Sequence, residues 1–314
     1  MLAAVTDPNV WKFHPHPEVW LLVAFLVGAY IYAIRVIGPR LVRPGQPVVR
    51  GRQIACFVAG IVLLWAASDW PIHDVGENNL YSVHMLQHMI LAYFAPPLLL
   101  MATPEWFLRL LIGDGRFYAV FRWFTKPVVA AVIFNVGVMV IHIPALVNAA
   151  VSNGPLHYSL HVMTVLTALL MWMPVCGPLP EVRLQPAGKM IYLFAQSIIP
   201  TVPAAWLTFA DGAVYKSYDH LPRVFGLTVT DDQQIAGVFM KVGGSIFLWS
   251  IVTVLFFNRF MKNWSQENGY ARMRMPDAEI VGHDEEQLTY EQVASEFERS
   301  APAVADPEVH APRE

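Results

Sequence analysis

Seven long apolar stretches run along the chain, separated by short polar segments. They cover about residues 18–38, 53–70, 80–101, 126–148, 157–176, 189–210 and 235–260. Each is close to the length of about 20 residues with which a helix crosses the hydrocarbon core of a membrane. A helix satisfies its own backbone polar groups, as lipid requires. The pattern therefore predicts an all-α integral membrane protein, a bundle of seven transmembrane helices.

Residues 105–124, between the third and fourth stretches, have a different pattern. Aromatic residues such as Trp106 and Phe117 alternate there with the bases Arg109, Arg116 and Arg122. This mixture is typical of short helices that lie in the membrane interface and do not span it. Prolines within the third and sixth stretches predict kinks, which a membrane bundle tolerates; they are Pro96, Pro97, Pro200 and Pro203.

The composition agrees with a membrane protein. Hydrophobic residues make up 55% of the 314 residues and charged residues only 14%, where a soluble domain has about 25% charged residues. The mean hydropathy is +0.43. No basic surface of useful size remains outside the short loops, which excludes a nucleic-acid partner. Membrane lipid is the surrounding that this composition predicts.

The basic residues predict the orientation, because cytoplasmic loops are enriched in Lys and Arg. The first, third and fifth connections and the segment after the last stretch are rich in bases, and the alternate connections are poor in them. This pattern places the N-terminus outside and the C-terminus in the cytoplasm. We expect an extracytoplasmic segment at 1–17, a membrane domain at 18–262 and a disordered cytoplasmic tail at 263–314. From Asp277 onward the tail has eleven acids and two bases.

The histidines gather on the predicted outer side. Of eleven histidines, nine lie outside or in the outer half of a span. His84 and His88 are four residues apart on the third span, and His157 and His161 repeat this spacing on the fifth, so each pair shares one helix face. Together with His142, near the outer end of the fourth span, they predict a metal site of five histidines. Neutral imidazole suits copper, zinc, iron and nickel; isolated histidines hydrogen-bonded across helices are the alternative.

Further ligands are possible near this set. They are His73, Asp69, Asp232 and Met240. Asp69 could instead orient a histidine, or be a solvated loop acid. Lys241 lies about 9 Å into the seventh span, and we expect it to extend back to the outer surface.

Several motifs resemble those of the seven-transmembrane CtaG-type cytochrome c oxidase assembly factors. They are Ser82-Val-His-Met-Leu-Gln-His-Met-Ile-Leu, Ala95-Pro-Pro-Leu-Leu-Leu with Pro104, His142-Ile-Pro-Ala-Leu, His157-Tyr-Ser-Leu-His, Tyr215-Lys-Ser-Tyr and Asp232-Gln-Gln-Ile-Ala-Gly-Val-Phe-Met. The similarity covers about residues 18–260. The chain departs from the pattern at Val147, where a tyrosine is expected, and at Lys241, where an aromatic residue is expected.

The resemblance implies a multi-pass protein of a bacterial cell membrane that helps to mature a haem–copper oxidase. As a metallochaperone and not an enzyme, it would bind copper through the outer histidines and deliver it to a cytochrome c oxidase subunit. Two alternatives stay open from the residues alone. One is a b-type cytochrome with haem held between histidine pairs. The other is a seven-span zinc hydrolase in which an aspartate such as Asp69 or Asp232 is the base. The oligomeric state is not predicted.

Overall fold

The computed structural model describes residues 11–221, 224–274 and 290–299. Within these residues the chain is helical and has no strand. Six helices are long and apolar enough to cross a membrane, and a bent pair of helices brings the number to seven if it counts as one span. The predicted fold class, an all-α multi-pass membrane protein, is confirmed. Which end faces the cytoplasm stays a prediction.

The chain divides into two units, Met1–Phe260 and Met261–Glu314. The helices of the membrane bundle are α1 (Pro17–Tyr32), α2 (Gly38–Leu41), α3 (Gly51–Ser68), α4 (Ile72–Asn78), α5 (Tyr81–Met89), α6 (Ala95–Ala102), α7 (Glu105–Ile112), α8 (Arg116–Phe124), α9 (Pro127–Ile141), α10 (Pro144–Val151), α11 (Gly154–Cys176), α12 (Pro186–Gln196), α13 (Thr201–Thr208), α14 (Val229–Val238) and the first part of α15 (Gly244–Arg274). Helix α16 (Tyr290–Arg299) lies wholly within the second unit.

Three π-helical turns join helices into longer ones: Ala33–Ile37 between α1 and α2, Ile90–Phe94 between α5 and α6, and Phe239–Gly243 between α14 and α15. Helix α15 continues to Arg274, past the expected end of the membrane domain at residue 262. The remainder of the predicted disordered tail lies outside the described residues, apart from α16.

Prolines change the hydrogen bonding inside two spans. Pro96 has no N–H to donate to the carbonyl of Ala92 four residues earlier. The indole of Trp172 on α11 donates to that carbonyl instead, at 3.0 Å, which ties the two spans together. In the sixth span a turn that includes Pro200 separates α12, which ends at Gln196, from α13, which begins at Thr201.

The predicted fourth span, residues 126–148, is interrupted in the structure. Helix α9 ends at Ile141, and Pro144 is the first residue of α10. Because a proline disfavours the helical region for the residue before it, Ile143 is extended (φ −66°, ψ 123°). Helix α9 alone is about 22 Å long, and it forms the bent pair with α8, at 64°.

Two short helices, α7 and α8, occupy the segment with alternating aromatic and basic residues. Neither has a buried residue. They are joined through Gly113 and Gly115, whose φ angles of 64° and 72° favour glycine.

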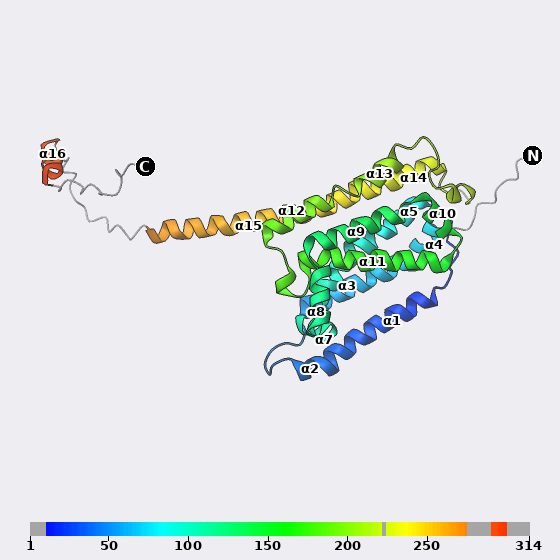
Figure 1. Ribbon diagram of the computed structural model, residues 1–314, viewed down its shortest axis with the longest axis horizontal. Coiled ribbons are helices and arrows are strands. Elements are labelled where there is room, and N and C mark those ends of the chain that lie inside the picture. The colour runs from blue at the N-terminus through cyan, green and yellow to red at the C-terminus, as the bar shows by residue number, and fades with distance from the viewer. Residues whose placement is uncertain (1–10, 222–223, 275–289, 300–314) are drawn as a thin grey trace, which may run out of the picture. The chain divides into compact units, whose positions relative to one another are not determined.

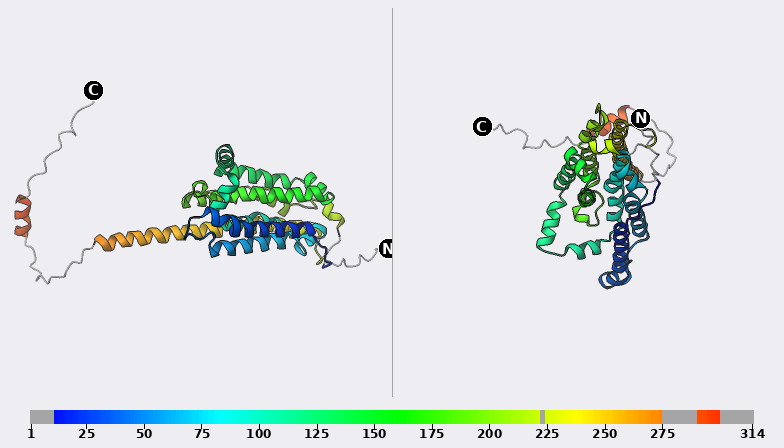
Figure 2. Two further views of the ribbon diagram at one scale, coloured as in Figure 1. Left: turned by 90° about the horizontal axis from the view of Figure 1, so that it is seen from below. Right: turned by 90° about the vertical axis from the view of Figure 1, so that its right-hand side faces the viewer.

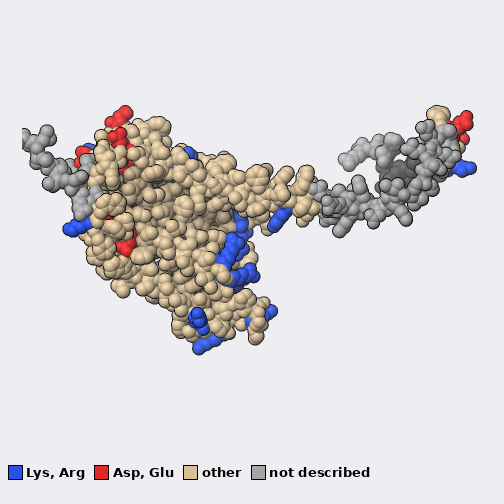
Figure 3. Space-filling view, turned by 180° about the vertical axis from the view of Figure 1, so that it is seen from behind, with Lys and Arg blue, Asp and Glu red and all other residues tan. Residues whose placement is uncertain are grey.

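Figure 1 places α4 and α10 at one end of the bundle and α2 and α7 toward the other. We call the first the histidine end, because His16, His73, His84 and His157 lie there, and the second the arginine end, because Arg43, Arg50, Arg109 and Arg183 lie there. On the face drawn in Figure 3, most Lys and Arg side chains of the bundle lie away from most of its acidic ones.

Candidate metal centre

Helix α5 carries two of the predicted histidines, and its start is fixed by a residue from another helix. Leu80 precedes α5 and offers no side-chain cap. The carboxylate of Asp232 on α14 accepts hydrogen bonds from the backbone N–H groups of Tyr81 (2.7 Å) and Ser82 (3.0 Å). These are N–H groups that a helix start leaves unpaired, and a negative charge there is favourable. Asp232 therefore holds α5 in place, and both of its oxygens are used for that.

Three imidazoles meet inside the bundle. His84 and His88 on α5 and His161 on α11 each offer a ring nitrogen, and the three nitrogens lie within 4.8 Å of one another. The Nε2 atoms of His84 and His88 are 3.1 Å apart, and the His88 and His161 ring centroids are 4.8 Å apart. Two nitrogens bound at about 2.0 Å to one tetrahedral ion are about 3.3 Å apart. We call this set the inner triad; the distance between the His84 and His88 nitrogens fits one shared metal ion.

Several nitrogens of the inner triad have no hydrogen-bond partner although they are buried. They are Nδ1 of His84 and His88 and Nε2 of His161. Buried polar atoms are nearly always paired, so each of these nitrogens is free to take a hydrogen-bond partner or a metal ion. A cavity of about 30 Å³ lies beside the rings, which is room for about one water or ion. Its wall includes Met85 and Val147, the latter one of the two positions at which the chain departs from the family pattern.

A second group of ligands lies next to the first. His73 and Glu77 on α4 and His157 on α11 offer three ligand atoms within 4.8 Å of one another. The Nε2 atom of His73 is 3.1 Å from a carboxylate oxygen of Glu77. We call this set the outer triad. The structure thus places the predicted histidines in two groups: a ring nitrogen of His157, expected to converge with those of His161 and the others, lies with the possible ligand atoms of α4.

Close packing of α4 on α5 brings the two triads together. At Gly76 a Cβ atom would lie 3.0 Å from both Cα and N of His84, so any other residue would require the two helices to separate by a few tenths of an ångström. The ring of His157 is then 4.4 Å from that of His161 and 5.4 Å from that of His84.

Gln87, fully buried between the triads, contacts both. Its Nε2 atom is 3.0 Å from Nδ1 of His73 and 3.5 Å from Nδ1 of His161, and its Oε1 atom has no partner. Neither Gln87 nor Glu77 is among the site residues predicted from the sequence. The four-residue spacing of His73 and Glu77, equal to that of the histidine pairs, was the available signal for the glutamate. For Gln87 it was an amide inside an apolar span.

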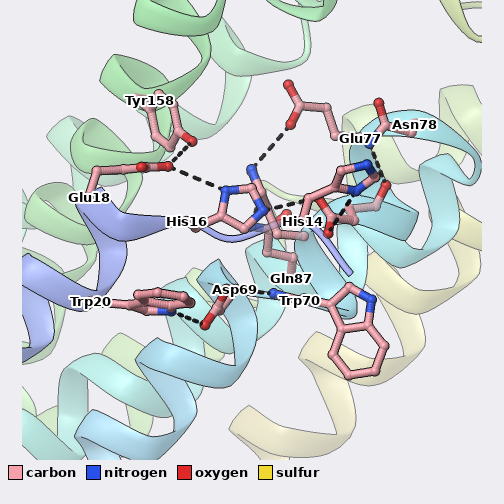
Figure 4. Close-up of polar contacts among 12 residues, drawn as sticks. His14, His16, Glu18, Trp20, Asp69, Trp70, Glu77, Asn78, Gln87 and Tyr158 are labelled. Carbon is pink, nitrogen blue, oxygen red and sulfur yellow. Dashed lines mark hydrogen bonds and ion pairs between the residues drawn. The ribbon is translucent and has the colours of Figure 1, made fainter. Parts of the chain in front are cut away.

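Residues just before α1 lie beside His73 of the outer triad, and Figure 4 shows His14 and His16 near Glu77 and Gln87. His16 donates from Nε2 to Asp74 at 3.0 Å, and its ring is 4.9 Å from that of His73. Burial alone would lower the pKa of His16, but the hydrogen bond and charge of Asp74, and then those of Glu18, outweigh it and raise the pKa. Glu18 also accepts a 2.7 Å hydrogen bond from Tyr158 on α11.

The other predicted ligands have different surroundings. His142 caps α9 and donates from Nδ1 to the Val138 carbonyl at 2.6 Å; its Nε2 atom is buried and unpaired, but it belongs to neither triad. The carboxylate of Asp69 accepts from the indoles of Trp20 and Trp65 and from the backbone of Trp70.

Met240 and Lys241 lie on the π-helical turn before α15. Met240 packs in an apolar cluster with Tyr81 and Met85. Lys241 donates to the Thr201 hydroxyl at 2.7 Å and to the Ser197 carbonyl at 3.4 Å. This differs from our expectation that the Lys241 side chain extends to the outer surface. The turn between α12 and α13 provides hydrogen-bond acceptors for it inside the bundle.

The fold and the histidine cluster define a multi-pass helical membrane protein with histidine side chains gathered at one end. The family model of the cytochrome c oxidase caa3 assembly factors (Caa3_CtaG) matches residues 28–262. The chain belongs to this family, which confirms the resemblance seen in the motifs, and it is a cytochrome c oxidase assembly factor. No curated protein and no solved structure matches the chain.

Proposed function

We propose that this assembly factor holds a copper ion at the inner triad and delivers it to a subunit of a haem–copper oxidase in a bacterial cell membrane. The observation that carries the proposal is the convergence of His84, His88 and His161, with ring nitrogens within 4.8 Å of one another. A haem–copper oxidase contains copper, so its assembly requires that copper be delivered to it. Family membership supports the assembly role.

The ligand types favour copper over harder ions. The inner triad offers three imidazole nitrogens and no carboxylate, and the thioether of Met85 lies in the cavity wall. Imidazole and thioether ligands suit copper, whereas magnesium and calcium prefer oxygen.

The alternatives fit less well. A cavity of about 30 Å³ beside the triad is far below the roughly 300 Å³ or more of a pocket for a large organic ligand, which disfavours haem. A zinc hydrolase needs a carboxylate free to act as base. The predicted bases, Asp69 and Asp232, accept hydrogen bonds from three and two N–H groups respectively.

Delivery requires that the ion leave by ligand exchange. A copper ion can exchange its histidine ligands one at a time, so an acceptor subunit that docks at the histidine end can replace them in sequence. We propose that this end faces the outside of the cell, as the basic residues predict.

The test is the metal content and optical spectrum of the detergent-purified protein after copper loading. We expect about one or more copper ions per chain and no Soret band, with loss of copper from His84→Ala/His88→Ala. His14→Ala is the matched control, since His14 is exposed and belongs to neither triad. In cells, the double variant should lower the copper content of the oxidase. A protein that stays metal-free after loading contradicts the proposal; a Soret band would indicate a cytochrome, and bound zinc a hydrolase.

A further inference from the structure

We propose that the outer triad, His73, Glu77 and His157, is a second metal site, at which a Cu²⁺ ion binds before it moves to the inner triad. This inference rests on the proposed function for the destination of the ion, but not for the existence of the site. The ligands are two imidazoles and one carboxylate, converging from α4 and α11 to within 4.8 Å. Such a set binds divalent first-row ions.

The two sites differ in their access to solvent. The side chain of Glu77 is 27% exposed, whereas that of His73 is 2% exposed. His84 and His161 of the inner triad are buried. An ion that arrives at the histidine end therefore meets the Glu77 carboxylate first, and that negative charge attracts a cation.

The rings form a continuous path between the sites. His157 of the outer triad lies 4.4 Å from His161 and 5.4 Å from His84, measured between ring centroids. An ion can thus change from one ligand set to the other by exchanging neighbouring imidazoles, without a large movement of helices. Its oxidation state does not change in this step.

Gln87 can prepare both sites at once. Rotating its amide by half a turn places Oε1, which has no partner, where Nε2 now faces Nδ1 of His73 and of His161. The oxygen has two lone pairs and can accept from both Nδ1–H groups. Each ring is then held with Nε2 deprotonated and free to bind a metal. Partners of this kind fix the tautomer and orientation of metal-binding histidines.

The test counts Cu²⁺ ions per chain by equilibrium dialysis and records their electron paramagnetic resonance spectra. Glu77→Gln and His73→Ala remove outer ligands, and His88→Ala removes an inner one. Glu105→Gln is the matched control, because Glu105 is an exposed glutamate at the arginine end. We expect two ions in the wild type and in the control. In Glu77→Gln, one of the two should bind at least about tenfold more weakly. The ion left in His88→Ala should show a spectrum of mixed nitrogen and oxygen ligation.

The outcomes separate the two ideas. If the wild type binds one ion, which is lost in His88→Ala and kept in His73→Ala and Glu77→Gln, the outer site is refuted and the proposed function stands. If one ion is lost only in the outer variants, the outer site stands and the inner site fails. Two ions whose affinities are unchanged in both outer variants refute the outer site, and a wild type that binds none refutes both.

A separate feature, at the arginine end, carries a second inference. A cavity of about 970 Å³ opens there. Its lining includes six cationic side chains and one acidic one; the cations are Arg43, Arg50, Arg52, Arg109, Arg183 and Lys189. The acid, Glu105, is paired with Arg109 at 2.8 Å. Within the described residues, the other five cations form no ion pair, so the cavity has a strong positive charge.

The cavity is also partly apolar. Leu100, Met101 and Val175 line it, and the indole of Trp106 donates to the Val48 carbonyl at 2.9 Å, which holds the loop before α3 against α7. A phosphate group beside apolar chain is the chemistry of a phospholipid. Basic pockets between transmembrane helices bind anionic headgroups. We propose that this cavity binds the headgroup of an anionic phospholipid.

Native mass spectrometry of the detergent-purified protein tests this, with phosphatidylglycerol, phosphatidylcholine and inorganic phosphate as probes. Arg43→Gln/Arg50→Gln/Arg52→Gln removes cavity cations, and Arg116→Gln/Arg122→Gln on α8 removes exposed bases outside it. We expect phosphatidylglycerol to bind to the wild type and to the α8 control in preference to phosphatidylcholine, and this preference to disappear in the triple variant. Equal binding of both lipids to the wild type refutes the proposal. Displacement by millimolar inorganic phosphate would identify free phosphate as the ligand and refute a lipid site.

Discussion

Gln87 has no charge and is no metal ligand, yet its amide contacts one ring in each triad. Replacing it by leucine keeps a similar volume, removes both contacts and adds no metal ligand. We expect Gln87→Leu to weaken copper binding by about 10- to 100-fold at each triad, the usual effect of losing such a partner. Competition with a chromogenic copper chelator measures this. Gln185→Leu, at an exposed position, is the control, and equal affinities of the two variants would contradict the role.

His16 should make the stability of the protein depend on pH. Its pKa is raised in the folded protein, because the hydrogen bonds and charges of Asp74 and Glu18 outweigh the effect of burial. The charged form is thus favoured by folding. The stabilisation is fully present below the unfolded pKa of about 6.5 and is lost as the pH rises through the higher folded pKa.

The difference in thermal midpoint between wild type and His16→Ala should therefore be larger at about pH 6 than at about pH 9. Thermal unfolding in detergent measures it. A difference that is the same at both pH values would show that the Asp74 contact acts without charge.

At the scale of helices, Asp232 connects α14 to the start of α5. Asp232→Ala leaves two buried N–H groups unpaired, at a cost of about 1–3 kcal/mol each. Asp232→Asn keeps one acceptor oxygen and should lose less. We expect both variants to have a lower free energy of unfolding and weaker copper binding than the wild type, with a larger loss in Asp232→Ala than in Asp232→Asn. Asp211→Asn, an exposed aspartate, should change neither; if Asp232→Ala behaves likewise, α5 is held by its apolar packing.

Gly76 sets the distance between α4 and α5. In Gly76→Ala the new Cβ would lie 3.0 Å from the backbone of His84, so α4 and α5 would separate by a few tenths of an ångström and shift His73 and Glu77 relative to His84. We expect fewer Cu²⁺ ions per chain and a lower thermal midpoint.

Gly28→Ala on α1 is the matched control for Gly76→Ala, because nothing lies within 4 Å of its new Cβ. Alanine is favoured over glycine inside a helix by about 1 kcal/mol, so Gly28→Ala should be neutral or stabilising. A similar result for Gly76→Ala would show that α4 can yield without disturbing the triads.

For the whole molecule, the predicted orientation can be tested with two single cysteines in a Cys56→Ser/Cys176→Ser background. Ser152→Cys lies between α10 and α11, and Asp114→Cys between α7 and α8. An impermeant thiol reagent added to intact spheroplasts should label Ser152→Cys at once and Asp114→Cys only after permeabilisation. The opposite result would place the histidine end in the cytoplasm, so that copper would have to arrive from inside.

The spans were predictable because hydropathy depends on about 20 residues together, whatever their tertiary partners. The prolines predicted a change in the helix in the sixth span, where α12 and α13 are separated by a turn, but not that Trp172 would donate to the Ala92 carbonyl in place of the missing N–H of Pro96. Residues 71–79 read as a loop with no bases, because α4 has only seven residues and no long apolar period. This short helix brings Glu77 to His157, so the division into two triads depends on a contact that spacing along the chain does not encode.

Helix α1 lies at the edge of the bundle (Figure 2) and buries only Val19 and Tyr30. It is tied near one end by the Trp20 indole on Asp69 (2.7 Å) and toward the other by the Tyr30 hydroxyl on the Ala102 carbonyl (3.2 Å). An element with so few buried contacts opens at a lower free energy than the core helices. Its amides should exchange with deuterium before those of α5 and α11. Because His16 directly precedes α1, each such opening also moves the His16 ring away from His73. How often the outer triad is uncovered would then be set by α1, a helix that supplies none of its ligands.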